Sequence, residues 1–394
     1  MNKAARFLPV PFLVGVMLFS LTACAQPSAS SSGSSGSQPA GKDTQQPIVI
    51  GLVTEVTGPQ AGTGDNQTNG IKLAFDEVNQ KGGIKGRQIK LVIEDDASTP
   101  PGTVNAYNKI IADQKPVATF IPNFANFDMA VEPAIKKAGI PAITGASGPG
   151  VTAVGNPWIF RVRTNDDIMG KLAAEYAVKE MGAKKIAILS VTGEMGAGAS
   201  KVVKETLEKL GSPPVAMESY NMDDKDVTAQ LLNIQKANAD LVIGWSYPPD
   251  AAMIMTNMSQ LGVNMKLLGS PAYGIADALK LAKQAANGHT VIVDWAPNDE
   301  PAIQEWVKKI EAKAKLPANF IQSVYYDGAN ILAQVIEKSG TEPKAIQDGL
   351  RAVKGYKGIT GEYTFDEKGD GLRQAYIGQI KDEKVSVIKT VKGQ

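Results

Sequence analysis

The residue types that most often supply nucleophiles, proton carriers and metal ligands are scarce in this chain. Cys24 is the only cysteine and His289 the only histidine among 394 residues. An intramolecular disulfide, a thiolate metal cluster and a site with several histidine ligands are therefore excluded, as is a mechanism that pairs a histidine base with a nearby cysteine. His289 follows Gly288 just before an apolar run, a setting typical of packing or surface positions. We expect no catalytic group, no cofactor and no metal.

Two glycine-rich segments have the composition to hold a ligand through backbone N–H groups. Residues 57–65 contain Gly62-Thr63-Gly64, but Gln67 stands where a dinucleotide fingerprint needs its third glycine, and no Walker A lysine follows. A plain connecting loop is the alternative here. Residues 144–150 (TGASGPG) form the second segment. Its small residues permit close backbone approach, and its N–H groups with the Ser147 hydroxyl suit a carboxylate.

Length and charge limit the classes of function. A chain of 394 residues is too long for one core of the usual size, so two lobes are expected. The 43% hydrophobic and 21% charged residues are ordinary for a soluble α/β protein. Lys and Arg number 41 against 40 Asp and Glu, which gives a net charge of +1. Such a balanced surface argues against nucleic acid as a partner, because phosphate binding needs a basic face.

Apolar runs alternate with helical patterns from Ile48 onward. A run of four to eight apolar residues between turn signals predicts a buried strand, and parallel strands need helical crossovers. The first series has predicted strands at 48–53, 88–93, 117–121, 141–144 and 158–163. The second series has predicted strands at 185–190, 215–219, 240–244, 266–269 and 291–293. Helices are predicted after it near 300–314, 319–338 and 343–353. The chain closes with predicted strand runs at 359–365, 376–380 and 385–388. Two such series predict two Rossmann-like, doubly wound α/β lobes with a ligand cleft between them.

The N-terminal segment has the layout of a secretory signal. Lys3 and Arg6 precede an apolar stretch at 8–21 that is too short to span a bilayer comfortably. It ends in Leu21-Thr22-Ala23-Cys24, which looks like a bacterial lipobox that is cut before Cys24 and leaves this cysteine attached to diacylglycerol. The alternative is an ordinary signal peptide. Residues 25–47 are rich in Gly and Ser, which predicts a flexible tether with a reach of roughly 25 Å.

Residues 79–87 (NQKGGIKGR), followed by Ile89-Lys90-Leu91-Val92 and Asp95-Asp96, closely resemble the first unit of branched-chain amino-acid-type substrate-binding proteins of ABC transporters. The resemblance extends over roughly residues 48–390. It implies the periplasmic binding protein type I fold, with a three-strand hinge near Arg163, Val293 and Gly369. The implied division is a signal peptide at 1–23, a lipidated tether at 24–47, a first lobe at 48–163 with 293–369, and a second lobe at 164–292 with 370–394.

The same resemblance implies a ligand-binding set in the first lobe. These residues are Thr63, Ala125, Asn126, Ala146, Ser147 and Gly148. Ala125 departs from the pattern, because the family usually offers a carboxylate-binding serine there. Asn126 or Ser147 would then have to take the place of the missing hydroxyl. Neither loop offers a basic side chain.

In the second lobe the resemblance implies that Met195, Tyr247 and Tyr273 contact the ligand. Met195 stands where the family places an aromatic residue in a loop, and a thioether can shape an apolar pocket. The sharper departure is Pro271, which occupies the place of an acid that pairs with a ligand ammonium. Either Asp65, Glu194 or Asp294 replaces that acid, or the ligand has no ammonium, because an unpaired buried ammonium is costly.

The resemblance implies an extracytoplasmic receptor, anchored to the bacterial membrane through lipidated Cys24 alone. It would capture a small amino acid or related carboxylate between its lobes and deliver it to an ABC permease. A ligand sensor of the same fold is the first alternative, and it would need a signalling or transmembrane segment, which is not predicted after residue 48. An enzyme that hydrolyses its substrate with carboxylates alone is the second.

Overall fold

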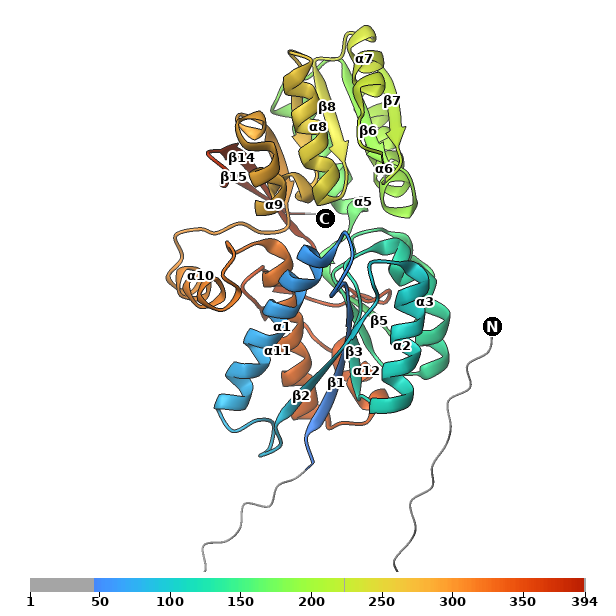
Figure 1. Cartoon of the computed structure of the whole chain (residues 1–394), viewed down its shortest axis with the longest axis vertical. Helices are drawn as coiled ribbons and strands as arrows, with labels where there is room; N and C mark the ends of the chain where they lie inside the picture. The colour runs from blue at the N-terminus through green and yellow to red at the C-terminus, as the bar shows by residue number, and fades with distance from the viewer. Residues whose placement is uncertain (1–45, 223, 393–394) are drawn as a thin grey trace, which may run out of the picture. The chain divides into compact units, whose positions relative to one another are not determined.

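Two large β-sheets organise residues 46–222 and 224–392, the parts of the chain that the computed structural model describes (Figure 1). A six-stranded sheet has the order β13-β5-β4-β3-β1-β2 and a seven-stranded sheet the order β15-β14-β10-β9-β8-β6-β7. We call each sheet with its covering helices a lobe, the first lobe holding the six-stranded sheet. The predicted α/β fold with two doubly wound lobes is confirmed.

The first lobe contains a wholly parallel sheet. Its strands are β1 (Ile48–Thr54), β2 (Ile89–Asp95), β3 (Ala118–Phe120), β4 (Ala142–Thr144), β5 (Ile159–Thr164) and β13 (Asp370–Leu372). Its helices are α1 (Ala61–Gln80), α2 (Pro100–Gln114), α3 (Ala125–Ala138), α4 (Gly150–Ala153), α10 (Pro301–Ala314), α11 (Phe320–Ser339) and α12 (Pro343–Arg351). Figure 1 shows α1 and α11 on one side of this sheet and α2 and α3 on the other.

The second lobe combines parallel and antiparallel strands. Its parallel strands are β6 (Ile186–Val191), β7 (Ala216–Tyr220), β8 (Leu241–Trp245), β9 (Lys266–Gly269) and β10 (Thr290–Val293), and β14 (Gln374–Lys381) and β15 (Lys384–Lys392) extend the sheet antiparallel. Its helices are α5 (Asp166–Lys179), α6 (Glu194–Lys209), α7 (Thr228–Lys236), α8 (Pro248–Gln260), α9 (Ala276–Ala282) and the short 3₁₀ turns η1 (Pro271–Gly274) and η2 (Lys283–Ala286).

The side chains along β1 alternate between two buried clusters, so both faces of this strand are covered. Ile50 and Leu52 pack into a buried cluster with residues of α1 and α11, whereas Val53 packs into another cluster with residues of α2 and α3. Successive side chains of a strand point to opposite faces, so a parallel strand covered on both faces reads as a continuous apolar run. This is the pattern from which the strand was predicted.

Two helices begin earlier than the sequence predicts. Residues 57–65 were expected to form a loop, but α1 begins at Ala61, which places Thr63 in its first turn. Gly64 is needed there because a Cβ atom would lie 2.1 Å from the carbonyl oxygen of Glu55. Likewise α6 begins at Glu194, so Met195 lies in a first helical turn and not in a loop.

The run at 359–365, predicted as a strand beside the closing strands, forms only a small separate hairpin. Its strands are β11 (Tyr356–Lys357) and β12 (Glu362–Tyr363). The backbone N–H groups of Ile359 and Thr360 donate to the buried carboxylate of Asp327, at 2.8 and 2.7 Å. These bonds hold the segment against α11, and although the N–H group of Thr364 donates to Gly371 of β13 at 2.9 Å, the hairpin strands join neither large sheet.

The chain passes between the sheets three times. It leaves the first sheet after β5 and the second after β10, and the last passage separates β13 from β14, between Leu372 and Gln374. The Thr164 hydroxyl donates to the carbonyl oxygen of Gln374 at 2.6 Å, and Arg163 pairs with Asp294 at 2.8 Å, so polar contacts join the three passages. The lobe boundaries given above stay a prediction. None of the helices described here has the length and apolar character that crossing a membrane requires.

Candidate functional site

A cleft lies where both lobes present strand carboxyl ends and helix N-termini. The space between its walls is about 460 Å³ when its opening to solvent is included. Five residues predicted from the sequence line it: Thr63, Ala125, Ser147, Met195 and Tyr247. The remaining lining residues are Asn123, Phe124, Arg163, Asp166, Trp245, Ser246, Pro248, Ser270, Pro271, Ala272, Ile275, Phe320 and Ile321.

The N-terminus of α3 supplies hydrogen-bond donors to the first-lobe wall. Phe124 precedes this helix and its side chain makes no capping hydrogen bond. The first N–H groups of a helix have no acceptor within it and carry partial positive charge, which favours an anion. Ala125 lines the cleft, and the half-buried Asn126 follows it. The Oδ1 atoms of Asn123 and Asn126 are buried without a hydrogen-bond partner among the residues described.

The loop after β4 is held from below by Arg161, which is fully buried. Its guanidinium donates to the carbonyl oxygens of Ser147 at 2.8 Å and Gly148 at 2.9 Å, and it pairs with Asp370 at 3.1 Å. The N–H group of Ala146 donates to the Thr144 hydroxyl at 2.8 Å. Of the three residues predicted here, the structure therefore brings Ser147 to the cleft, while Ala146 and Gly148 lie behind it.

Tyr325 of α11 fixes the ends of β3 and β4 relative to one another. Its hydroxyl accepts from the N–H group of Gly145 at 2.8 Å and lies 3.1 and 3.2 Å from the carbonyl oxygens of Ile121 and Pro122. A Cβ atom on Gly145 would lie 2.8 Å from the Tyr325 ring, so this approach requires glycine. Both cleft loops of the first lobe are thus positioned by one buried hydroxyl.

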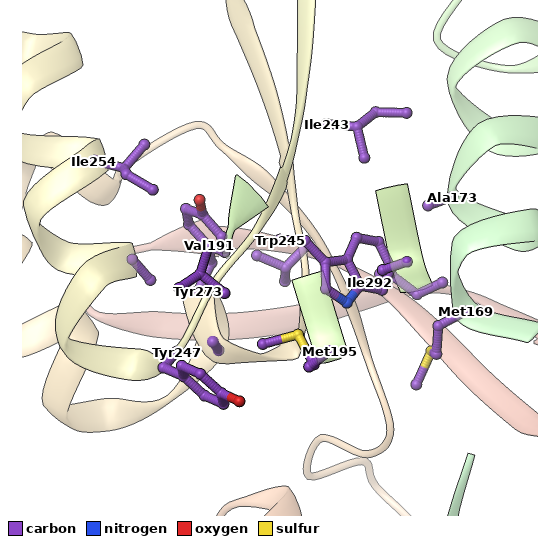
Figure 2. Close-up of a cluster of buried hydrophobic side chains, with 14 of the residues drawn as sticks. Met169, Ala173, Val191, Met195, Ile243, Trp245, Tyr247, Ile254, Tyr273 and Ile292 are labelled. Atoms are coloured by element: carbon purple, nitrogen blue, oxygen red, sulfur yellow. The ribbon is translucent and has the colours of Figure 1, made fainter. Parts of the chain in front are cut away.

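Aromatic and sulfur-containing side chains form the second-lobe wall. Tyr247, at the end of β8, lies with its ring centroid 5.0 Å from that of Phe124 in the first lobe, so the two lobes touch across the cleft. Figure 2 shows Tyr247 and Met195 at the lower edge of the buried cluster, with the Tyr273 hydroxyl pointing away from them. Tyr273 is fully buried beneath Gly244 and Gly269 and does not line the cleft.

Arg163 and Asp166 are the charged residues among those described that line the cleft, and sequence reasoning did not assign either to the site. Arg163 donates through Nε to Asp294 at 2.8 Å and lies 4.4 Å over the Phe320 ring. The side chain of Asp166 accepts from Trp245 Nε1 at 3.1 Å. The signal that could have located both was their position, at the end of one predicted strand and the start of the next helix.

Burial sets the protonation of the acids near the cleft. Burial raises the pKa of Asp166 to about 6, opposed by the positive charge of Arg163 and by hydrogen bonding from Ser147 and Trp245. Burial also raises the pKa of Asp294, opposed by Arg163. Asp294 is fully buried against Arg163, whereas Asp65 is exposed. Neither Asp294 nor Asp65 lines the cleft. The side chain of Glu194 and all of Cys24 lie outside the described residues. Pro271 lines the cleft.

Comparison with known proteins identifies the family. A family model described as periplasmic binding protein matches residues 47–384. The chain belongs to this family. It is 29% identical over 328 residues to a leucine-, isoleucine-, valine-, threonine- and alanine-binding protein of Pseudomonas aeruginosa, covering 82% of this chain and 87% of that protein. It is 28% identical over 334 residues to a Leu/Ile/Val-binding protein of Rhizobium johnstonii, covering 84% and 90%.

Solved structures share the fold of this periplasmic binding protein. A branched-chain amino acid transporter substrate-binding protein from Streptococcus pneumoniae, in complex with isoleucine, superposes with a TM-score of 0.82 at 23% identity, covering 88% of this chain and 99% of that one. A solute-binding protein of an ABC transporter from Rhodopseudomonas palustris, in complex with p-hydroxybenzoic acid, gives 0.80 at 22% identity, covering 89% and 98%. The predicted type I fold is confirmed. The chain is an extracytoplasmic solute-binding receptor that delivers its ligand to a transporter.

Proposed function

We propose that this receptor captures a small amino acid or a related carboxylate between its lobes. The observation that carries the proposal is the distribution of chemistry across the cleft. Hydrogen-bond donors gather on the first-lobe side, where α3 begins and Arg163 lies, and apolar side chains face them from the second lobe. A small carboxylate with an apolar remainder complements such a cleft.

Within this proposal the carboxylate lies against the N-terminus of α3, Asn126, Ser147 and Thr63. Tyr247 and Met195 pack on the other side of the ligand. Three buried residues next to the cleft would hold its loops and its base in place without contacting the ligand: Ala146, Gly148 and Tyr273. The support is geometric, since the first group lies at or beside the cleft and the second is buried next to it.

Binding to both lobes would favour their closed arrangement, with the three chain passages serving as the hinge. The proposed lobes are residues 48–163 with 293–369, and 164–292 with 370–394. We propose further that the protein releases its ligand unchanged. Its curated relatives are named as binding proteins. Incubation with each bound compound, followed by mass analysis for products, tests that part; turnover would contradict it.

We also propose that Cys24 carries a lipid that holds the receptor at the outer face of the bacterial cell membrane. The sequence Leu21-Thr22-Ala23-Cys24 and the Gly- and Ser-rich residues that follow support this attachment. The lipid would be the membrane contact of the receptor itself, and the permease would be its protein partner.

The ligand proposal is tested by a thermal-shift screen over amino acids, aromatic acids and small amides. A ligand at about 100 times its Kd adds about 2.7 kcal/mol to the free energy of unfolding. We expect stabilisation by amino acids or their carboxylate analogues, verified by calorimetry. Stabilisation by small amides alone, or by none of these compounds, would contradict the proposal.

A further inference from the structure

A second cavity lies behind the cleft, beside the passage of the chain from β10 to α10 (Figure 1). Its volume is about 340 Å³, at the lower end of the range for small-molecule pockets. The first lobe contributes α10 and the segment that leads into α11, and the second lobe contributes η1, α9 and the turn between β14 and β15. Because both lobes line this space at the passage between them, we call it the hinge cavity.

Two residues separate the hinge cavity from the cleft. Phe320 lines both spaces. Ile275 lines the cleft, while the residues on either side of it, 274 and 276, line the hinge cavity. The guanidinium of Arg163, which lines the cleft, lies 4.4 Å over the Phe320 ring. A molecule that contacts Phe320 from the hinge cavity therefore acts on the wall of the cleft.

The interior of the hinge cavity is mainly apolar. Leu279, Val293 and Trp295 are buried in its wall, and the half-buried Val307 of α10 adds to it. The charged residues among the described lining are all exposed: Glu311, Glu383 and Lys384. Burying a charge away from water is costly unless the charge is paired, so this cavity favours an uncharged molecule over an ion.

The amide side chains at the cavity are already engaged by the protein. Gln304 Nε2 donates to the carbonyl oxygen of Asn298 at 2.6 Å, and Asn319 Nδ2 donates to Asn66 at 3.0 Å. Apolar contact would therefore supply most of the affinity of a ligand in this cavity.

The hinge cavity is open while the lobes touch across the cleft. Tyr247 and Phe124 lie with their ring centroids 5.0 Å apart in this arrangement. We propose that the hinge cavity binds an uncharged, mainly apolar molecule, and that this molecule stabilises the closed arrangement of the lobes. A ligand favours the arrangement to which it binds more tightly, and the coupling between two sites is reciprocal. The inference goes beyond the proposed function, because it concerns a second ligand at a second site.

Indole is the probe for this site, since it is small, uncharged and mainly apolar. Calorimetry on the Cys24→Ala protein without any other ligand measures its affinity, and crystals grown with 4-bromoindole locate it through the anomalous signal of bromine. We expect binding, with the bromine signal beside Trp295 and Val307. Absence of binding at millimolar indole, or a bromine signal in the cleft alone, would overturn the proposal.

Variants place the probe independently of the crystals. Val307→Asp puts a charge into the apolar wall and should weaken indole binding at least about tenfold, while amino-acid affinity measured without indole stays unchanged. Val353→Asp is the matched control, because both valines are half-buried and pack against the same buried cluster of the first lobe, but Val353 does not line the hinge cavity. Ala276→Phe fills the cavity from the second lobe and serves as the second variant if Val307→Asp is too unstable to assay. Equal losses in the two aspartate variants, or full indole affinity in Ala276→Phe, would contradict the location.

Closure is measured in two ways. Scattering by the Cys24→Ala protein should give a smaller radius of gyration with saturating indole than without it. The amino acid with the largest thermal shift should bind about fivefold more tightly when indole is present, and Val307→Asp should abolish this gain. An unchanged radius with indole bound, or amino-acid affinity that indole does not raise, would refute the stabilised closed arrangement. If no amino acid binds, the proposed function fails, whereas indole affinity and scattering still decide this inference.

Discussion

Replacing Tyr325 by phenylalanine removes one hydroxyl from the place where the first lobe fixes its cleft loops. That hydroxyl accepts from the Gly145 N–H group at 2.8 Å and contacts the carbonyl oxygens of Ile121 and Pro122. The Ile121 carbonyl keeps another donor, because Gln67 Nε2 reaches it at 2.8 Å, and the Thr144 hydroxyl lies 3.1 Å from the Pro122 carbonyl and 2.6 Å from Asp128. The buried N–H of Gly145 is left without a partner.

The expected cost follows from that single group. An unsatisfied buried donor costs about 1–3 kcal/mol, so Tyr325→Phe should lower the free energy of unfolding by about 2 kcal/mol. Tyr326 provides a neighbouring control. Its hydroxyl donates to Glu77 at 2.7 Å in a partly exposed position, and Glu77 also pairs with Lys309 at 3.2 Å. Its loss leaves no buried group unpaired, so Tyr326→Phe should cost less than about 1 kcal/mol.

Urea unfolding, monitored by circular dichroism, measures the stability of both variants against the unmodified chain. The midpoints are compared when the dependence of the free energy of unfolding on urea concentration is the same. The reasoning predicts a clear order, with Tyr325→Phe the less stable variant and weaker in ligand binding. Equal losses in the two variants, or a loss below about 0.5 kcal/mol for Tyr325→Phe, would refute the assignment of Tyr325 as the group that fixes both loops.

Three further predictions concern binding, pH and attachment. Tyr247→Ala should weaken ligand binding about tenfold in calorimetry, because the ring packs against Phe124 across the cleft, and unchanged affinity would remove Tyr247 from the site. Burial raises the pKa of Asp166 to about 6, so the folded protein binds the proton of this carboxyl group more tightly than the unfolded chain does. The free energy of unfolding therefore falls as the pH rises from about 4 to 6. Asp166→Asn does not titrate and should gain about 2 kcal/mol in free energy of unfolding relative to the unmodified chain between pH 4 and 7, measured by urea unfolding, whereas parallel pH profiles would contradict the buried acid. Cys24→Ala should move the protein from the membrane fraction to the soluble fraction, and retention after a high-salt wash would argue against the lipid anchor.

Local patterns in the sequence were sufficient for most strands. Runs such as residues 48–53 and 185–190 are bounded by turn residues, and the observed strands begin and end within a residue of them. The starts of α1 and α6 were missed because glycines there indicated loops. Gly64 and Gly196 are needed for close approach to the carbonyl oxygens of Glu55 and Val191, which are contacts that composition does not reveal.

The candidate site was predicted less completely, because it depends on contacts between distant segments. The positions following strands were informative, and Ser147 and Tyr247 do line the cleft. Tyr273 has a residue type suited to a ligand but is packed beneath two glycines of neighbouring strands. Arg163 was taken only as a hinge position, since its pairing with Asp294 joins two passages of the chain that lie 131 residues apart in sequence.

Small-angle X-ray scattering tests most directly the claim that the two lobes close on a ligand. The Cys24→Ala protein would be measured alone and with a saturating amount of the amino acid that gives the largest thermal shift. Contacts from both lobes to one ligand predict a smaller radius of gyration in the bound state. A radius that stays the same while calorimetry reports full occupancy would contradict closure of the lobes around the ligand.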